Sequence, residues 1–271
     1  MTGPFYHYLI RSGWKGRVET PAALGAKFLK TLDALSRIDP RFANWELGAA
    51  FDSPTIPLDE TRSNIASLIE NCVSHDDYNE PDPNYGYHPK ALAGESRDSR
   101  SVIFKLDGGG KVDGGTDLSF GFYSDVPPDL TIVTYPVCKA ALLAINAIWQ
   151  APWACAQAFG FASVMIPVDI GGVQGTRIDS VAPLPRDPTF PYSIFHVPWI
   201  AYLSAEFTAG VKLPPEILTE RTRDGGLLMT ATKERLDPDN PEHARRARIL
   251  AETMIKQTGY PSGRGRPILD A

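Results

Sequence analysis

The stretch Gly225-Gly226-Leu227-Leu228-Met229-Thr230-Ala231-Thr232 is followed by Asp237-Pro238-Asp239-Asn240-Pro241 and then by a helical pattern that ends at Gly259. The first run is short, mostly apolar and opened by two glycines, which predicts a strand covered on both faces. Asn240 stands where an N-cap is preferred, Pro241 has the fixed φ of a first helical residue, and Gly259 suits a left-handed stop. This segment therefore predicts a strand that feeds a capped helix.

The predicted helix has one apolar face and one charged face. Arg248, Glu252 and Lys256 follow one another at i,i+4 spacing, which favours a solvated side with ion pairs. His243, in the first turn, is interpreted as a capping or surface histidine in preference to a catalytic one. The polar residues here therefore indicate fold rather than activity. The apolar face consists of Ala244, Ala247, Leu250, Ala251, Met254 and Ile255.

Periodicity along the rest of the chain predicts further strands and helices. In the helix predicted for residues 20–39, one apolar face consists of Leu24, Phe28, Leu32 and Leu35. Residues 149–161 fit either a helix or a strand, and residues 213–218 fit one or two helical turns. Two long stretches, residues 74–100 and residues 169–196, lack periodicity and are expected to be connections. The predicted strands cover residues 5–12, 42–50, 101–106, 117–123, 129–135, 164–168, 198–203 and 227–231, and the predicted helices cover residues 20–39, 58–73, 136–148 and 240–259.

This mixture of elements predicts an α+β fold. Each half of the chain contains strands and helices that need a sheet to cover them, and a Val-Pro-Pro sequence at residues 126–128 separates the halves. We therefore expect two closely packed α+β subdomains, residues 1–126 and residues 127–271, with mixed or antiparallel sheets and helices on one face.

The composition is that of a globular protein. The 271 residues are 43% hydrophobic and 22% charged, which is enough for a sizeable core. No run approaches the roughly 20 apolar residues of a membrane span, and the first residues lack the apolar segment of a signal peptide. Cys72, Cys138 and Cys155 lie in apolar patterns and cannot all pair, which favours buried free thiols. We therefore expect a soluble cytoplasmic protein without membrane contact.

Charge is distributed unevenly along the chain. Residues 39–99 carry twelve acidic and four basic side chains, whereas residues 1–38 carry six basic and two acidic ones. A nucleic-acid binder would show a basic domain, so the acidic block argues against direct nucleic-acid binding. It suits a basic protein partner instead.

Motifs for catalysis or metal binding are incomplete. Ser163 and Ser262 lack the G-x-S-x-G spacing of a catalytic serine, and Cys72 and His75 form one C-x-x-H pair without a second. The Gly-Gly-Gly-Lys run at residues 108–111 matches no phosphate-binding pattern and is interpreted as a flexible turn. The sequence therefore predicts no catalytic residue, no cofactor and no metal.

Two groups of residues remain as candidates for binding a partner. The long connection at residues 74–100 holds an acidic cluster without the spacing of a calcium loop, so it is either solvated or partner-binding. Trp14 and Arg17, at the end of the first predicted strand, form either an interaction hot spot or a tryptophan that closes the core beneath an arginine. The acidic cluster consists of Asp76, Asp77, Glu80 and Asp82.

Four motifs in this order resemble the immunity protein 52 family. The resemblance covers most of the chain and is densest in its last 75 residues. The motifs are Trp14-x-Gly16-Arg17, Asp39-Pro40 with Trp45, Pro198-Trp199-x-x-Tyr202-Leu203, and Gly225-Gly226 followed by Thr232-x-x-Arg235-Leu236-Asp237-Pro238-x-Asn240-Pro241-x-His243.

The resemblance implies a bacterial immunity protein of a type VI secretion or polymorphic toxin system. Such a protein neutralises a cognate nuclease toxin, commonly restriction-endonuclease-like, by protein–protein binding and needs no catalytic group. A nuclease cleft is basic because it must attract a polyanion, so an acidic inhibitor surface would be steered toward it. Two alternatives stay open: an adaptor or loading partner of a secreted effector, and an enzyme whose small-molecule site is scattered along the sequence.

Overall fold

The computed structural model describes residues 6–48, 55–76, 78–94, 102–120, 129–160, 163–170, 173–180, 197–237 and 239–258. Its main feature is a sheet of ten strands in the order β11-β12-β10-β7-β1-β6-β5-β4-β2-β3. Every pairing in this sheet is antiparallel. The strands are β1 (Tyr6–Trp14), β2 (Trp45–Gly48), β3 (Ile56–Pro57), β4 (Lys90–Ala93), β5 (Val102–Asp107), β6 (Gly114–Phe120), β7 (Trp153–Gly160), β10 (Val197–Leu203), β11 (Leu218–Arg221) and β12 (Leu227–Thr230).

The first strand, β1, lies at the centre of this sheet. It pairs with β6 on one side, where Ile10 lies opposite Leu118, and with β7 on the other, where Ile10 lies opposite Ala156. The predicted boundary between residues 126 and 127 lies outside the described residues, so the division into subdomains stays a prediction. Two further strands, β8 (Ser163–Ile170) and β9 (Val173–Ser180), pair with each other in a separate hairpin.

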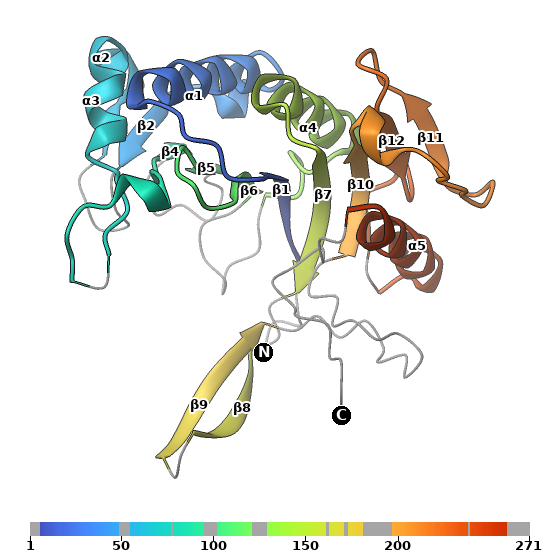
Figure 1. Cartoon of the computed structure of the whole chain (residues 1–271). Helices are drawn as coiled ribbons and strands as arrows, with labels where there is room; N and C mark the ends of the chain where they lie inside the picture. Colours follow the sequence, from blue (N-terminus) through green and yellow to red (C-terminus); the bar gives the residue numbers. More distant parts are fainter. Residues whose placement is uncertain are drawn as a thin grey trace.

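Helices cover the sheet and complete the α+β fold that the sequence predicts (Figure 1). Helices α1 and α4 run along one side of the sheet, and α5 lies beside β10 (Figure 1). The α-helices are α1 (Pro21–Ser36), α2 (Leu58–Thr61), α3 (Ile65–Glu70), α4 (Tyr135–Trp149) and α5 (Pro241–Thr258), and the 3-10 turns are η1 (Pro40–Phe42), η2 (Arg62–Asn64), η3 (Pro83–Tyr85) and η4 (Ala205–Phe207).

The core includes the space between the sheet and the helices α1 and α4, and α5 also contributes to it. The Thr20 hydroxyl caps α1 by accepting from the Ala23 amide at 3.2 Å, and Pro21 follows at the first helical position. Phe28 of α1 packs on Phe104 of β5 with ring centroids 5.3 Å apart. The apolar face predicted for this helix is confirmed, because Leu24, Phe28, Leu32 and Leu35 are all fully buried.

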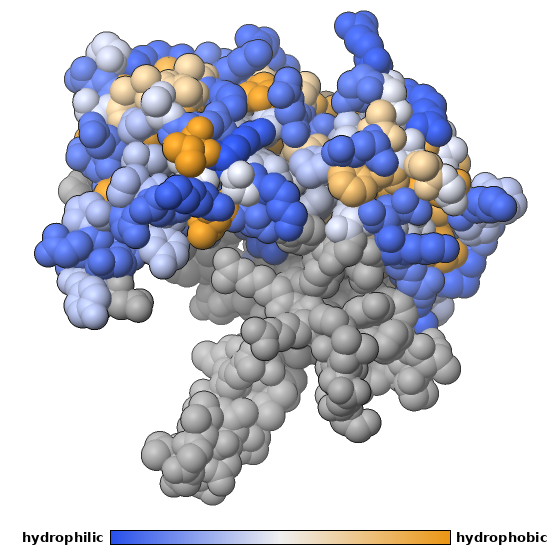
Figure 2. Space-filling model, viewed as in Figure 1, coloured by the Kyte–Doolittle hydropathy of each residue, from blue (hydrophilic) through white to orange (hydrophobic). Residues whose placement is uncertain are grey.

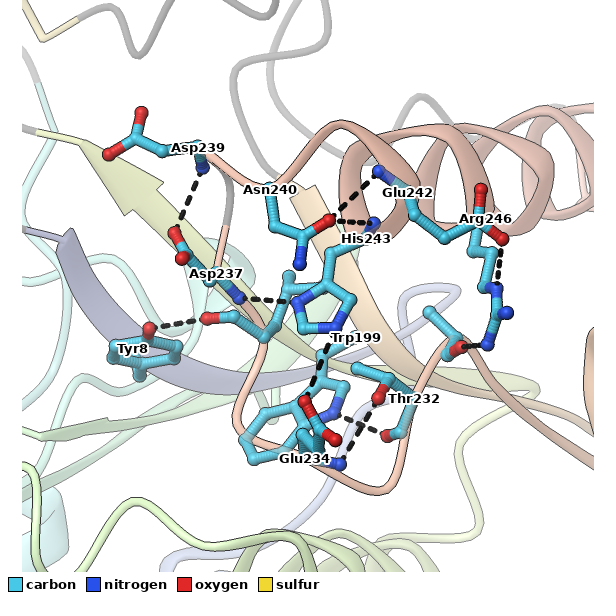
Figure 3. Close-up of polar contacts among 12 residues, drawn as sticks. Tyr8, Trp199, Thr232, Glu234, Asp237, Asp239, Asn240, Glu242, His243 and Arg246 are labelled. Carbon is cyan, nitrogen blue, oxygen red and sulfur yellow. Dashed lines mark hydrogen bonds and ion pairs between the residues drawn. The ribbon is translucent and has the colours of Figure 1, made fainter.

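The closing strand and helix have the predicted geometry (Figure 3). All four residues of β12 are buried, as expected for a strand covered on both faces. Gly225 has a φ of +83°, and a side chain at Gly226 would lie 2.6 Å from the Tyr202 ring. The Asn240 side chain accepts from the Glu242 amide at 3.0 Å, which confirms the N-cap. The predicted stop at Gly259 lies outside the described residues.

The segment between β12 and α5 is tied to the centre of the sheet. The Trp199 indole of β10 donates to the Thr232 carbonyl at 2.8 Å, and the Tyr8 hydroxyl of β1 donates to the Leu236 carbonyl at 2.6 Å (Figure 3). His243 is buried rather than on the surface, and its Nδ1 accepts from the Asp237 amide at 3.2 Å. His243 therefore holds the turn before α5, in line with a capping role.

Several predicted elements were wrong. Residues 129–135 do not form a strand, because the Asp129 carboxylate accepts from the Thr131 amide and hydroxyl in a turn that leads into α4. Residues 213–218 hold no α-helix and lead into β11. The helix expected at residues 58–73 is divided into α2, η2 and α3. Residues 74–100 and 169–196, expected to be connections, contain β4 and β9.

Residues 149–161, which fit either a helix or a strand from their sequence, contain the strand β7.

Candidate functional site

The acidic connection forms a projecting hairpin, residues 73–88, which we call the acidic hairpin (Figure 1, teal, after α3). Val73 bridges Tyr87, and His75 bridges Pro81. The Ser74 amide donates to the Gly86 carbonyl at 2.9 Å. The acidic hairpin is therefore held by its own backbone bonds, although it contains no long strand.

Three of the four predicted acidic residues, Asp76, Glu80 and Asp82, lie on this hairpin. The Asp76 carboxylate accepts from the amides of Tyr78 and Glu80, both at 2.9 Å. The Asp82 carboxylate accepts from the Asn84 amide at 2.9 Å and thereby caps η3, which begins at Pro83. The Glu80 side chain is exposed, and Asp77 lies outside the described residues. The carboxylates of Asp76 and Asp82 therefore have two roles: they carry negative charge, and they accept the hydrogen bonds that hold the turns of the hairpin.

Two tyrosines add exposed aromatic surface to the acidic hairpin. Tyr78 is 87% exposed and Tyr85 is 51% exposed. Figure 2, in the same view as Figure 1, shows a largely hydrophilic surface where the hairpin projects at the lower left. Carboxylates beside exposed tyrosines are a surface suited to a basic protein partner, because tyrosine supplies contact area and the carboxylates supply charge.

The other predicted pair, Trp14 and Arg17, lies at the end of β1. Trp14 is only 5% exposed and stacks on Trp149 with ring centroids 5.4 Å apart and planes 1° from parallel. The Arg17 guanidinium carbon lies 4.5 Å from the Trp14 ring centroid, and Nη2 donates to the Trp149 carbonyl at 2.8 Å. This is the geometry of a tryptophan that closes the core beneath an arginine. A role in partner binding stays a prediction.

A hollow of about 640 Å³ lies beside Trp14 and is lined in part by the acidic hairpin. Its walls come from the ends of β1, β5 and β6 and from the acidic hairpin, which contributes Ser74, His75, Tyr85 and His88. Trp14 and Trp153 give the hollow apolar walls. A volume of this size is typical of small-molecule sites.

The charged groups of the hollow are mostly acidic. Asp107, Asp113 and Asp117 line it together with Arg11. The Arg11 guanidinium binds the Asp117 carboxylate twice, at 2.7 and 2.8 Å. Burial alone would lower the pKa of Arg11. The hydrogen bonds to Asp117 and its negative charge have the larger combined effect, so the pKa of Arg11 is raised. Asp117 is thus neutralised within the wall, because its charge is matched by Arg11.

Ser74, His88 and Asp107 form a hydrogen-bonded chain in this hollow. The Ser74 hydroxyl is hydrogen-bonded to Nε2 of His88, and Nδ1 of His88 lies 2.6 Å from Oδ1 of Asp107. No linear motif predicts this cluster, because a motif such as G-x-S-x-G, which Ser163 and Ser262 lack, depends on neighbours along the chain. Ser163 begins β8, and Ser262 lies outside the described residues. Fourteen residues separate Ser74 from His88, and nineteen separate His88 from Asp107, so no local spacing connects them.

The glycine run at residues 108–110 is packed tightly against the acidic hairpin. Gly109 has a φ of +88°, and its carbonyl accepts from the Glu19 amide at 3.1 Å. A side chain at Gly110 would lie 2.4 Å from the Asn84 carbonyl oxygen. Close backbone approach therefore explains these glycines, which were expected to form a flexible turn.

In the part of the chain that the structure describes, the cysteines are buried or partly buried and the potential metal ligands are dispersed. No three His, Cys, Asp or Glu side chains gather there in a way that could hold a metal ion. Cys138 and Cys155 are buried and Cys72 is partly buried, and none of these three described residues is in a disulfide. Burial raises the pKa of the Cys155 thiol to about 12, which keeps it protonated. Within the same described ranges, no helix is long and apolar enough to cross a membrane.

The sheet and its helices define an α+β protein organised on one large antiparallel sheet. Among solved structures, the fold is similar to that of the Pseudomonas aeruginosa T6SS protein PA0821, with a TM-score of 0.50. The two share 15% sequence identity, and the match covers 94% of this chain and 74% of the other. No protein-family model and no curated protein sequence matches the chain. The likeness is therefore one of fold, and the resemblance to immunity protein 52 rests on the motifs quoted above.

Proposed function

We propose that this chain is a type VI secretion or polymorphic-toxin immunity protein, of the immunity protein 52 kind, that neutralises a nuclease toxin by binding it. The acidic hairpin carries the proposal, because it projects from the fold and combines carboxylates with exposed tyrosines. The structural neighbour is itself a type VI secretion protein, which supports the same system. The family motifs support the immunity role.

Electrostatic attraction would bring the two proteins together. A nuclease cleft carries positive potential for its nucleic acid, and the acidic hairpin offers the opposite sign. The hairpin is already ordered by its bridges and by the Asp76 and Asp82 caps, so little conformational entropy would be lost on binding. Tyr78 and Tyr85 would then supply the contact area that resists dissociation.

The direct test uses a nuclease toxin whose gene is adjacent to the gene of this chain. The nuclease domain is mixed with the purified protein, and both plasmid cleavage and complex formation by size-exclusion chromatography are measured. We expect a stable complex in which cleavage falls as the chain reaches equimolar amounts, and survival of cells that co-express the two proteins. Continued killing with no recovered complex would refute the proposal.

The contribution of the acidic hairpin is tested by removing its charge while keeping its shape. In the hairpin variant, the three aspartates Asp76, Asp77 and Asp82 become Asn and Glu80 becomes Gln. The amide oxygens still accept the capping hydrogen bonds, so the loop keeps its turns. We expect association with the toxin to slow by about tenfold or more at low salt, with a weaker salt dependence.

A matched control has the same change in net charge at four exposed glutamates on other elements, each replaced by Gln. Its association rate should exceed that of the hairpin variant by at least fivefold at low salt. Equal rates for the two variants would remove the acidic hairpin from the interface. The control residues are Glu60, Glu206, Glu234 and Glu252.

The adaptor alternative predicts a different result from the same materials. An adaptor would bind the effector and leave plasmid cleavage intact. The cleavage assay therefore separates the two functions even when a complex forms in both cases.

A further inference from the structure

Ser74, His88 and Asp107 share one wall of the hollow and are joined by two hydrogen bonds, serine to imidazole and imidazole to carboxylate. We propose that this cluster is a nucleophilic site that hydrolyses small carboxylic esters, with Ser74 as the nucleophile. The inference concerns chemistry in the hollow and does not depend on the binding of a toxin.

The backbone places the three side chains together. Tyr87 bridges Gly108 in antiparallel register, which sets His88 opposite Asp107. The His88 amide donates to the Cys72 carbonyl at 2.8 Å, which sets Cys72 opposite His88. Side chains alternate along an extended chain, so Ser74, two residues after Cys72, faces the same side as His88. The Ser74 carbonyl accepts from the Asp82 amide at 2.7 Å, which fixes the serine backbone on its other side. The cluster is thus built on three adjacent hydrogen-bonded segments.

The two nitrogens of His88 have different partners. The Asp107 carboxylate can only accept, so Nδ1 of a neutral His88 donates to it, and the lone pair of Nε2 faces the Ser74 hydroxyl. This is the tautomer that a general base needs in order to take the serine proton. Asp107 acts as a positioning residue, because it touches His88 and orients the ring without meeting the substrate.

The hollow gives the serine access to a substrate of limited size. Ser74 is 9% exposed and lines a space of about 640 Å³, while His88 and Asp107 lie closer to solvent. Trp14, Trp153 and Val112 contribute apolar wall, which suits the acyl or aryl part of an ester. The carboxylate of Asp107 lines the hollow beside His88 and disfavours an anionic substrate. A neutral ester with a short acyl chain is therefore the class that fits.

The proposed reaction follows from these positions. The Ser74 Oγ forms a bond to the ester carbonyl carbon while its proton moves to Nε2 of His88. The bond from this carbon to the alcohol oxygen then breaks, and His88 passes the proton to the departing alcohol. Water adds to the acyl-serine carbonyl and gives a proton to His88, which returns it to the Ser74 oxygen as the carboxylic acid leaves. The net reaction consumes one ester and one water and yields one acid and one alcohol.

Covalent labelling of the intact protein tests the nucleophile directly. The full chain is treated with a fluorophosphonate probe, and the adduct is located by peptide mass spectrometry. We expect the adduct on Ser74 and none on Ser12. Ser12 lines the same hollow, but its hydroxyl is hydrogen-bonded to the Thr116 hydroxyl rather than to an imidazole. Absence of an adduct at Ser74 in the folded wild-type protein would overturn the proposal.

Ester hydrolysis gives an independent measurement with p-nitrophenyl acetate as the probe. Ser74→Ala and His88→Gln should each lower the rate by about 100-fold or more. Asp107→Asn should lower it at least tenfold, and Asp107→Glu should restore part of the loss. Ser67→Ala, at an exposed serine of α3, should leave the rate unchanged.

Circular dichroism of each variant separates chemistry from folding. The three hydrogen-bonded residues could instead serve only to hold the acidic hairpin in place. The variants would then melt at lower temperatures, the wild-type protein would not be labelled at Ser74, and ester hydrolysis would not depend on the serine. That pattern would overturn the proposal. Because neither assay contains a toxin, failure of this inference and failure of the immunity proposal are distinguishable.

Discussion

The hydrogen bond from Tyr8 to Leu236 predicts how the stability of the protein changes at high pH. Tyr8 lies on the central strand β1, and its buried hydroxyl donates to the Leu236 carbonyl at 2.6 Å (Figure 3). Burial, aided by the charge of Asp237 and partly opposed by Arg235, raises the pKa of Tyr8 to about 12. The change to test is Tyr8→Phe, which keeps the ring packed against Trp199 and removes only the hydroxyl.

Two effects of opposite sign follow. At pH 7 the variant leaves the Leu236 carbonyl without its donor, so its unfolding free energy should be lower than that of the wild-type protein by about 1–3 kcal/mol. The folded wild-type protein holds the Tyr8 proton more tightly than the unfolded chain does. Its stability is therefore full below pH 10 and falls as the pH rises toward 12, by about 2 kcal/mol at pH 11.5. Phenylalanine does not titrate, so the advantage of the wild-type protein should shrink by that amount.

Urea unfolding of both proteins at pH 7, 9, 10.5 and 11.5, followed by circular dichroism, measures this difference. Other groups that titrate at high pH are common to the two proteins and cancel in the comparison. Tyr78→Phe, at an exposed position on the acidic hairpin, should stay near the wild-type value throughout and serves as the matched control. A difference between Tyr8→Phe and the wild-type protein that is constant from pH 7 to 11.5 would refute the reasoning.

Two further predictions concern backbone and acid stability. Gly226→Ala should lower the unfolding free energy by about 2 kcal/mol or more, because the new side chain would lie 2.6 Å from the Tyr202 ring and 2.7 Å from the Leu203 carbonyl oxygen. Thermal melting measures this loss, and an unchanged melting temperature would contradict the prediction. The hydrogen bonds from Arg41 lower the pKa of Asp39, so the stability gained from this ionised carboxylate is present at pH 5 and is lost as the pH falls below about 4. Asp39→Asn should therefore be less stable than the wild-type protein at pH 6 and approach it near pH 2, and a gap of the same size at both pH values would argue against this.

Local signals in the sequence predicted the parts of the fold that depend on neighbours along the chain. The cap at Asn240, the buried strand β12 and the apolar face of α1 follow from residue type and spacing, and the structure confirms each of them. The prediction failed where a short strand forms only because a partner is present. β4 has four residues, and its pairing with β2 and β5 is what makes it a strand.

The candidate sites show the same division. Charge and composition predicted the acidic cluster as a candidate for partner binding. The structure adds that Asp76 and Asp82 also cap the turns of the acidic hairpin. The sequence left open whether Trp14 is an interaction hot spot or closes the core, and it could not predict the stacking on Trp149, since the two rings come from different elements. The same holds for Ser74, His88 and Asp107, which no linear motif connects.

By itself, the sequence determined the α+β class, the capped final helix and the acidic surface, because each depends on spacing or composition within a few turns or strands. Tertiary structure alone decided that β1 lies at the centre of the sheet, that Tyr8 reaches Leu236 across the length of the chain, and that a serine, a histidine and an aspartate line one hollow. The physical reason is that β-pairing is set by contacts between distant segments, whose total energy is decided only when the whole sheet has formed.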